Sequence, residues 1–354
     1  MPSTIAGRVI DNTRRPIGGV SISRRGKVIA ESANDGFFSI NLAKAESRVA
    51  VTFAAEGYVS NTRVFDSRAA VLGNVVVIWP RAYRVTFDPS RQLDIGLGSS
   101  GIRVPADVLE GLGGKKVSGN VELHFTWFDV TDPFQRAAAP GDFSGRLADG
   151  SVRRLSSYGI FDFDLRDLRG GSLSVRRGAN VELSIAVPPS LADHAPGQVG
   201  SFSFDASSGI WVHDGTFDYV PGAQTFNGKV RSIGPRCLDP VLDTVCVRVR
   251  VINIYTSSVG MPNMLVTVQG GQYAFSATSD ANGFTCLVVE RNAPFSVTAQ
   301  GGSGGNFWGT PHPVNFTSPS SGAGDCANPG SCPVIGTVPV DFVVGTGHRA
   351  GDFG

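Results

Sequence analysis

Apolar and polar residues alternate along most of the chain, and this period of two predicts β-strands with one buried face. In VELHFTWFDV the positions expected to face a core are all apolar: Val121, Leu123, Phe125 and Trp127. The 45 glycines and 21 prolines are dispersed between such runs as single turn residues. Helical periodicity is nearly absent. The pattern therefore predicts an all-β protein.

Two local signals refine this prediction. FSFDASSGIWVHDG carries a Ser-Ser-Gly turn between two alternating runs, which predicts a hairpin in which Gly209 takes a positive φ. At residues 105–112, PADVLEGL has proline at a first helical position and glycine at its end. This segment is the best candidate for a short helix.

One turn-and-strand phrase occurs twice, as SANDGFFSI at residues 32–40 and as TSDANGFTCLV at residues 278–288. The spacing also repeats, because Pro16 precedes Gly36 by 20 positions and Pro262 precedes Gly283 by 21. Each glycine supplies a turn conformation that a side chain would resist. The two copies lie too far apart for a solenoid repeat. We expect a duplicated small sandwich at the two ends of the chain.

The length of 354 residues suggests two or three domains. We place β-sandwiches at residues 1–81, 82–236 and 237–345, followed by a tail at residues 346–354. Proline interrupts the strand pattern in IWPRAY and in IGPRCLDP, which predicts linkers at both places.

Charge and hydropathy narrow the classes of partner that the chain is expected to bind. Lys plus Arg number 31 and Asp plus Glu number 30, and neither sign gathers in one stretch, so nucleic acid and anionic membranes are not expected partners. No apolar run approaches the roughly 20 residues of a membrane span. The first residues, MPSTIAGRVID, lack the layout of a secretory signal.

All five cysteines lie in the last third of the chain. Cys326 and Cys332 flank a Gly/Pro-containing loop, and this spacing predicts a disulfide between them. For the others, Cys246 and Cys286 would pair across neighbouring strands and leave Cys237 free, or Cys237 would pair with Cys246; we favour the first. Disulfides would indicate an oxidising compartment, and five unrelated thiols are the alternative.

The first sandwich carries IAGRVIDNTRRPIGGVSIS, ANDGFFSINL and VTFAAEGYV. Over residues 4–80 these segments resemble the carboxypeptidase regulatory-like domain, which implies a transthyretin-like sandwich of seven strands. The matching positions are Gly7, Val9, Pro16, Gly19, Val20, Asp35, Gly36, Phe38, Ile40, Gly57 and Tyr58. Residues 246–343 are similar, with Leu265 where Gly19 stands and Thr285 where Phe38 stands.

The middle of the chain carries VPADVL, VSGNVELHFTWFDVTDP, PGDFSG, LSSYGIFDFDLRD and SFSFDASSGIWVHDG. These segments cover most of residues 100–215 and resemble the conserved region of cartilage intermediate layer proteins and of bacterial surface proteins. Family members often follow with a His-Phe-Ser segment similar to one at which related domains cleave themselves. NGKVRSIGPRCLDP has no such histidine, so self-cleavage is not expected.

Candidate site residues are few. Asp129, Asp132 and Asp142 share one turn-rich segment, where aspartate ordinarily accepts hydrogen bonds from the backbone and where calcium is the alternative. NFWGTPHP places Phe307 and Trp308 in a Gly-containing loop, as a platform for a ligand or folded back onto the core. No motif predicts zinc, a nucleotide or an activated nucleophile, so we expect no cofactor and no catalytic centre.

These features favour a non-enzymatic structural or adhesive protein of a bacterial surface or secreted assembly, acting as a spacer and docking module. Its expected partners are proteins, including copies of itself, that bind through the sandwich surfaces. The alternatives are a carbohydrate-binding module, with glycans as partners, and a structural component of a virion or injection apparatus. The expected location is extracellular or at the cell surface.

Overall fold

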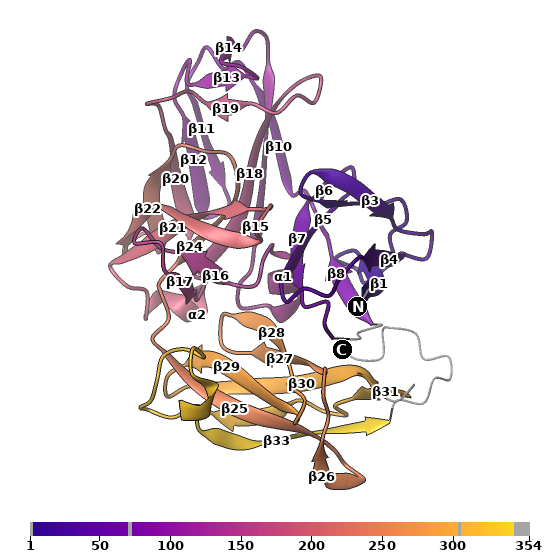
Figure 1. Cartoon of the computed structure of the whole chain (residues 1–354). Coiled ribbons are helices and arrows are strands. Elements are labelled where there is room, and N and C mark those ends of the chain that lie inside the picture. Colours follow the sequence, from indigo (N-terminus) through magenta and orange to yellow (C-terminus); the bar gives the residue numbers. More distant parts are fainter. Residues whose placement is uncertain (1–2, 70–72, 304–305, 343–354) are drawn as a thin grey trace.

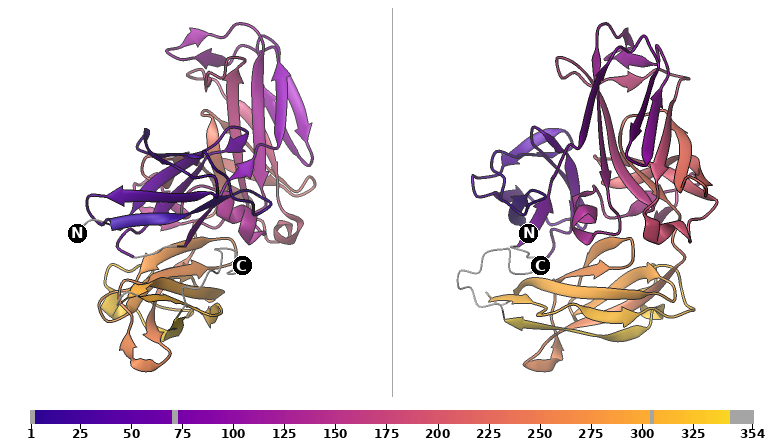
Figure 2. Two further views of the ribbon diagram at one scale, coloured as in Figure 1. Left: turned by 90° about the vertical axis from the view of Figure 1, so that its right-hand side faces the viewer. Right: turned by 180° about the vertical axis from the view of Figure 1, so that it is seen from behind.

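The protein is built almost entirely of strands, arranged as consecutive β-sandwiches (Figures 1 and 2). The computed structural model describes residues 3–69, 73–303 and 306–342. The predicted tail at residues 346–354 lies outside this range. The predicted all-β class is confirmed. Sheet membership divides the strands into a first sandwich (β1 to β9), a middle sandwich (β10 to β24) and a third sandwich (β25 to β33).

The first sandwich packs a sheet of order β4-β1-β8 against a sheet of order β3-β2-β5-β7, with β6 and β9 as a separate pair. In β4, Phe38, Ile40 and Leu42 alternate inward as the sequence predicts. The strands are β1 (Ser3–Ile10), β2 (Ser21–Arg24), β3 (Lys27–Glu31), β4 (Phe37–Leu42), β5 (Val49–Ala54), β6 (Tyr58–Val59), β7 (Asn61–Phe65), β8 (Asn74–Val77) and β9 (Trp79–Pro80).

The middle sandwich is the largest, with a 12-stranded sheet whose main path runs β10-β15-β18-β24-β21-β22-β23-β20-β12-β11 and a small sheet of order β14-β13-β19. Its elements are β10 (Tyr83–Phe87), β11 (Leu93–Leu97), β12 (Ser100–Val104), β13 (Leu109–Gly111), β14 (Lys115–Lys116), β15 (Val121–Phe128), α1 (Pro133–Ala138), β16 (Ser144–Arg146), β17 (Val152–Arg154), β18 (Gly159–Asp167), β19 (Ser174–Val175), β20 (Val181–Ala186), α2 (Pro189–Ala192), β21 (Gln198–Asp205), β22 (Ile210–Val220), β23 (Thr225–Val230) and β24 (Gly234–Asp239).

The third sandwich is a nine-stranded arrangement with the main path β26-β25-β33-β31-β30-β27-β28. Its elements are β25 (Thr244–Asn253), β26 (Thr256–Gly260), β27 (Leu265–Gln269), β28 (Ala274–Thr278), β29 (Phe284–Glu290), β30 (Pro294–Ser303), β31 (Asn306–Gly309), β32 (Val314–Thr317), the 3-10 turn η1 (Pro329–Ser331) and β33 (Val334–Phe342).

The first and third sandwiches share one topology. β1 pairs antiparallel with β4 and parallel with β8, and β25 pairs in the same way with β29 and β33. The second sheets also correspond, since β2 pairs with β3 and β5 as β27 pairs with β28 and β30. This agreement supports the predicted duplication.

Two serines make equivalent hydrogen bonds in the two copies. The Ser32 hydroxyl donates to the carbonyl oxygen of Ile17 (2.8 Å) and accepts from the backbone N–H of Val20 (2.9 Å). Ser279 makes the same pair of bonds, at 2.7 and 2.9 Å, to the two ends of the corresponding turn. Each serine thereby joins a distant turn, through two hydrogen bonds, to the turn-and-strand segment that occurs twice in the sequence.

The turn glycines are equivalent too, with φ of +76° at Gly36 and +81° at Gly283. The structure corrects one detail of the alignment, because Asn263 and not Leu265 takes the place of Gly19. Asn263 has a φ of +56° and Gly19 one of +71°. The N–H of Gly19 donates to the carbonyl oxygen of Ser32, and the N–H of Asn263 donates to that of Ser279. Asparagine tolerates this conformation, so the glycine is not required there.

Two local predictions were wrong. Residues 105–112 form no helix, since Asp107 has a φ of +57° and the chain continues into β13, paired with β14 and β19. The linker predicted at IGPRCLDP is instead β24, which lies between β18 and β21 inside the middle sheet. Pro235 is tolerated near the start of this strand. The predicted hairpin is confirmed between β21 and β22, with a φ of +68° at Gly209.

The strand β15 departs from simple alternation. Val121, Leu123 and Phe125 are buried as predicted, but Trp127 is only half-buried and the expected outer face is buried at His124 and Thr126. The chain that joins the first and middle sandwiches covers this face: the backbone N–H of residue 82 donates to the Thr126 hydroxyl at 3.1 Å. Both faces of β15 are therefore largely shielded from solvent.

Candidate functional site at the junction of the three sandwiches

The segment between β15 and β16 lies where the three sandwiches meet, and it carries the helix α1 (Figure 1). Two of its aspartates shape the segment locally. Asp129 accepts hydrogen bonds from the backbone N–H (2.9 Å) and hydroxyl (2.6 Å) of Thr131. Asp132 caps α1 by accepting from the N–H of Phe134 (2.8 Å). Both are the turn roles that aspartate ordinarily plays.

Asp142 forms ion pairs with Arg48 of the first sandwich, at 2.5 Å, and with Arg154 of the middle sandwich, at 3.9 Å. Burial alone would raise the pKa of Asp142, but Arg154 and Arg48 outweigh it and lower this pKa below its usual value. The guanidinium carbon of Arg154 also lies 3.9 Å from the ring centre of Phe275 in the third sandwich. One carboxylate thus organises contacts among all three sandwiches.

The three aspartates do not converge on a common point. Within the described residues, the group of ligand atoms close enough together for one ion consists of Cys246, Cys286 and Cys332, and the sulfurs of all three are in disulfides and are not thiolate ligands. The structure gives Asp129, Asp132 and Asp142 turn, cap and ion-pair roles, and calcium binding by them stays a prediction.

Arg136 ties α1 to the third sandwich. Its side chain is buried, at 3% exposure, and its Nη1 donates to the carbonyl oxygens of Val130 (3.0 Å) and Gly271 (2.6 Å). Ser156 adds a hydrogen bond of 2.8 Å to Gln272 of the same third-sandwich turn. The middle and third sandwiches also share one continuous apolar core.

The first sandwich docks on the same segment. The N–H of Gly141 donates to the carbonyl oxygen of Thr62 at 2.7 Å, and Asn61 donates to the carbonyl of Ala137 at 3.3 Å. The tip of the β21–β22 hairpin presses on β7, because a Cβ at Gly209 would lie 2.5 Å from a methyl carbon of Val64. This position needs glycine both for its φ and for its close approach.

The first and third sandwiches also touch directly. The Thr278 hydroxyl donates to Asp66 at 2.5 Å, and Ala69 packs against Leu265. Each of the three pairs of sandwiches therefore has its own contacts, and the arrangement is a closed triangle and not a string (Figure 2).

A second distinctive region is the segment of residues 318–333, which covers the solvent side of β25 and β29. Disulfides join Cys246 to Cys332 and Cys286 to Cys326, with Cα separations of 5.4 and 6.0 Å. The predicted bridges Cys326–Cys332 and Cys246–Cys286 were wrong, because the segment crosses the two strands and each of its cysteines bonds to the strand beneath. Cys237 is free and buried, as the favoured alternative had it.

The aromatic pair expected as a ligand platform lies in β31. Trp308 packs edge-on against Phe342 of β33, with ring centres 5.7 Å apart, and also contacts the core. Phe307 is half-buried. This placement matches the folded-back alternative for Trp308, while ligand binding by either ring stays a prediction.

Several charged groups are buried in interiors that were expected from the sequence to be apolar. Arg236 is 1% exposed and pairs with Asp214 at 2.9 Å. Burial raises the pKa of Asp239 to about 7, and the neighbouring Cys237 thiol and Ser157 hydroxyl oppose this only in part. Burial and the nearby Asp164 likewise raise the pKa of Asp162 to about 7.

An open groove of about 650 Å³ runs over the solvent-facing side of β12, β20, β23 and β22. Along one border, Arg103 pairs with Asp94 (2.8 Å) and with Glu182 (3.6 Å), which in turn pairs with Lys229 (3.1 Å). Its floor contains the small residues Gly101, Ser184 and Gly228. Charged, amide and hydroxyl side chains lie along the groove beside Ile102 and Leu183, and no aromatic side chain is among its lining residues.

The chain is similar to cartilage intermediate layer protein 2 of Homo sapiens, with 27% identity over 234 residues, which are 60% of this chain and 19% of that protein. The Mus musculus protein is 28% identical over 204 residues, 53% of this chain and 17% of its own length. The chain thus spans about a fifth of the length of these relatives. The match agrees with the predicted resemblance to cartilage intermediate layer proteins. No family model matches the sequence, so the carboxypeptidase regulatory-like resemblance of the end sandwiches stays a prediction.

Among solved structures, the chain is similar to BcpA, the major pilin subunit of Bacillus cereus, with 9% identity, a TM-score of 0.20 and coverage of 97% of this chain and 100% of that one. The Bacillus anthracis TIE protein gives 8% identity, a TM-score of 0.21 and coverage of 96% and 51%. At these scores the likeness carries no argument. No helix among the described residues is long and apolar enough to cross a membrane.

Proposed function

We propose that the chain is a structural module of a surface or secreted protein that holds its three sandwiches in one fixed arrangement and presents their outer faces to partner proteins. The observation that carries this proposal is the junction at α1. A flexible spacer would need only short linkers between its domains, whereas here each pair of sandwiches shares buried or charge-assisted contacts.

The cysteines support the proposed location. Two disulfides fasten one surface segment to the third sandwich, and such bridges persist in oxidising compartments. An extracellular or cell-surface setting is therefore part of the proposal. Surface labelling of the intact source cells with a membrane-impermeant reagent tests it, and protection of the folded protein from the reagent in intact but not in lysed cells would contradict it.

The fixed arrangement is tested by small-angle X-ray scattering. We expect the wild-type protein to fit one compact arrangement. Arg136→Gln removes the buried contact from α1 to the third sandwich and is expected to increase the radius of gyration, whereas exposed Arg153→Gln serves as the matched control. Wild-type scattering that requires a broad ensemble of domain orientations would refute the proposal.

Carbohydrate binding is a second candidate, and the groove on the middle sandwich is the observation that favours it. Asp218, Asn227 and Thr216 offer carboxylate, amide and hydroxyl groups along its lining, which are the groups that bind sugar hydroxyls. A glycan array probed with wild type and Asn227→Ala decides this candidate. Hits that survive the substitution would place any glycan elsewhere, and no hits at all would remove the candidate.

A further inference from the structure

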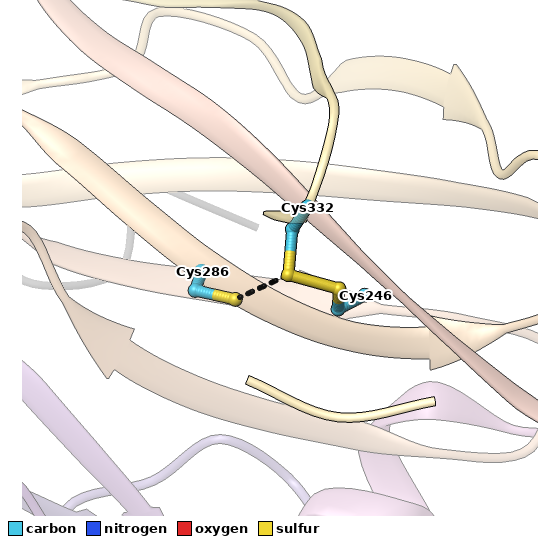
Figure 3. A group of neighbouring side chains, drawn as sticks. All are labelled: Cys246, Cys286 and Cys332. Atoms are coloured by element: carbon cyan, nitrogen blue, oxygen red, sulfur yellow. Dashed lines mark hydrogen bonds between the residues drawn. A yellow bond between two sulfur atoms is a disulfide. The ribbon is translucent and has the colours of Figure 1, made fainter. Parts of the chain in front are cut away.

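The four bonded cysteines form one sulfur cluster, and the two bridges differ in their access to solvent. Cys246 and Cys332 are 0% and 1% exposed, whereas Cys286 and Cys326 are half-buried. The Sγ atoms of Cys286 and Cys332, which belong to different bridges, lie 3.6 Å apart (Figure 3). An inner bridge thus lies in contact with an outer bridge that solvent reaches.

We propose that Cys326 is a modification site for an external thiol and that the inner bridge traps the product. In the first step a thiolate from outside attacks the Sγ of Cys326. A new disulfide forms between the external sulfur and Cys326, the Cys286–Cys326 bond breaks, and its electron pair leaves with Cys286 as a thiolate.

In the second step the Cys286 thiolate attacks the Sγ of Cys332. The Cys286–Cys332 bond forms, the Cys246–Cys332 bond breaks, and Cys246 leaves as a thiolate that takes up the proton released by the external thiol. Two disulfides exist inside or on the chain before and after, so the sequence needs no oxidant and no reductant. Overall, the external thiol is consumed, Cys326 gains a mixed disulfide, and Cys246 becomes a buried free thiol.

The Cys286 thiolate has two intramolecular targets, Cys332 in the second step and Cys326 in the reverse of the first. The Sγ atoms of Cys286 and Cys332 lie 3.6 Å apart, and the Sγ of Cys286 is also within 4.8 Å of that of Cys246. Cys286 therefore lies to one side of the Cys246–Cys332 bond, and its side chain, once freed from Cys326, rotates into line with that bond before it attacks. An intramolecular attack at this range competes with external thiols as if its nucleophile were present at very high concentration. The segment that carries Cys332 is anchored during the exchange, because Nε of Arg248 donates to the Cys332 carbonyl oxygen at 3.0 Å.

Burial makes the product persistent. An ordinary mixed disulfide is cleaved again by the thiol it has just displaced. Here Cys286 is consumed in the new bridge, and the remaining thiol, Cys246, sits in the interior, where a thiol stays protonated and unreactive. Arg248 is the direct cross-strand neighbour of Cys286, and a cation at this place favours the transient thiolate.

The experiment uses the full chain in the Cys237→Ser background, which removes the other thiol, with reduced glutathione as the probe at about 1 mM in the absence of oxygen. After acid quenching, free thiols are alkylated under denaturing conditions and the disulfide-linked peptides are mapped by mass spectrometry. We expect glutathione on Cys326, a Cys286–Cys332 bridge and an alkylated Cys246. Glutathione on Cys326 with Cys286 alkylated and the inner bridge intact overturns the proposal, as does the absence of any adduct.

The double variant Cys246→Ala, Cys332→Ala provides the matched comparison, because it removes the trap and keeps the outer bridge. Its Cys286 thiolate can only attack the adduct and restore the starting bridge. We therefore expect the adduct at equilibrium to fall at least tenfold relative to the parent. Equal adduct in both proteins contradicts the trap. If the double variant does not fold, the peptide map of the parent alone still decides.

Discussion

Asp239→Asn should change how the stability of the protein depends on pH. Asp239 is 1% exposed, and neither of its carboxylate oxygens has a hydrogen bond of normal geometry to a described residue. Its pKa is raised from 3.8 to about 7 by burial. Asparagine keeps the shape of the side chain but has no proton to lose. The substitution therefore isolates the titration of this one carboxyl.

The sign follows from the two states. Between pH 4 and pH 7 the unfolded chain has lost the Asp239 proton and the folded chain has kept it, so unfolding releases a proton and stability falls as pH rises. Above pH 7 the folded and the unfolded chain have both lost this proton, so Asp239 no longer makes stability depend on pH. Each pH unit between pH 4 and pH 7 lowers the free energy of unfolding by about 1.4 kcal/mol. Between pH 5 and pH 8 the wild type should therefore lose about 3 kcal/mol of stability relative to the variant. Asp162 shifts in the same direction but is present in both proteins and cancels.

The assay is urea-induced unfolding followed by tryptophan fluorescence, for wild type, Asp239→Asn and the exposed control Asp193→Asn at pH 5, 6, 7 and 8. We expect the free-energy difference between wild type and Asp239→Asn to move towards the variant from pH 5 to pH 7 and to level off by pH 8, and the control difference to stay level throughout. A difference for Asp239→Asn that is equally flat would show that this carboxyl does not titrate near pH 7 in the folded protein.

Three further predictions concern packing and turns. Gly209→Ala should destabilise by about 1–3 kcal/mol more than Gly178→Ala in urea unfolding, because both glycines have positive φ but a Cβ meets a neighbour only at Gly209; equal effects would contradict the close docking. Trp211→Ala, at 1% exposure, should lower stability by about 3–5 kcal/mol, and a loss below 1 kcal/mol would argue against its burial. Ser32→Ala and Ser279→Ala should each cost about 1–3 kcal/mol, and strongly unequal losses in thermal unfolding would count against their equivalence.

The sequence predicted features that depend on the local backbone. Gly36 and Gly283 indicate the positions of their turns, because no other residue type suits a positive φ as well. The serines that precede them by four positions lie inside the same repeated phrases, but their role was not visible. Their partners, Ile17 and Met261, are 15 and 18 residues away, and the sequence spacing does not report which backbone group folds back on a side chain.

The errors arise where a residue's environment comes from distant parts of the chain. The spacing of Cys326 and Cys332 describes a loop, but pairing depends on where that loop crosses the sheet beneath it. In β24, proline was the reason for predicting a linker. Arg236 is accommodated inside the sheet because Asp214, 22 residues earlier, pairs with it there and Ser201 and Ser232 accept its other hydrogen bonds. Charge balance of this kind is a property of the folded arrangement.

The parallel pairing of β1 with β8 and of β25 with β33 has a mechanical consequence. β1 and β8 are the first and last strands of the two packed sheets of the first sandwich, β25 and β33 are the first and last strands of the third, and each pair lies side by side in the same direction. Tension along the chain therefore pulls β1 and β8 past each other, and all the hydrogen bonds of their ladder bear the load together, whereas antiparallel terminal strands would open one bond at a time. In the third sandwich the Cys246–Cys332 disulfide joins the beginnings of β25 and β33, so a covalent bond carries the load there. The end sandwiches are thus built to resist extension.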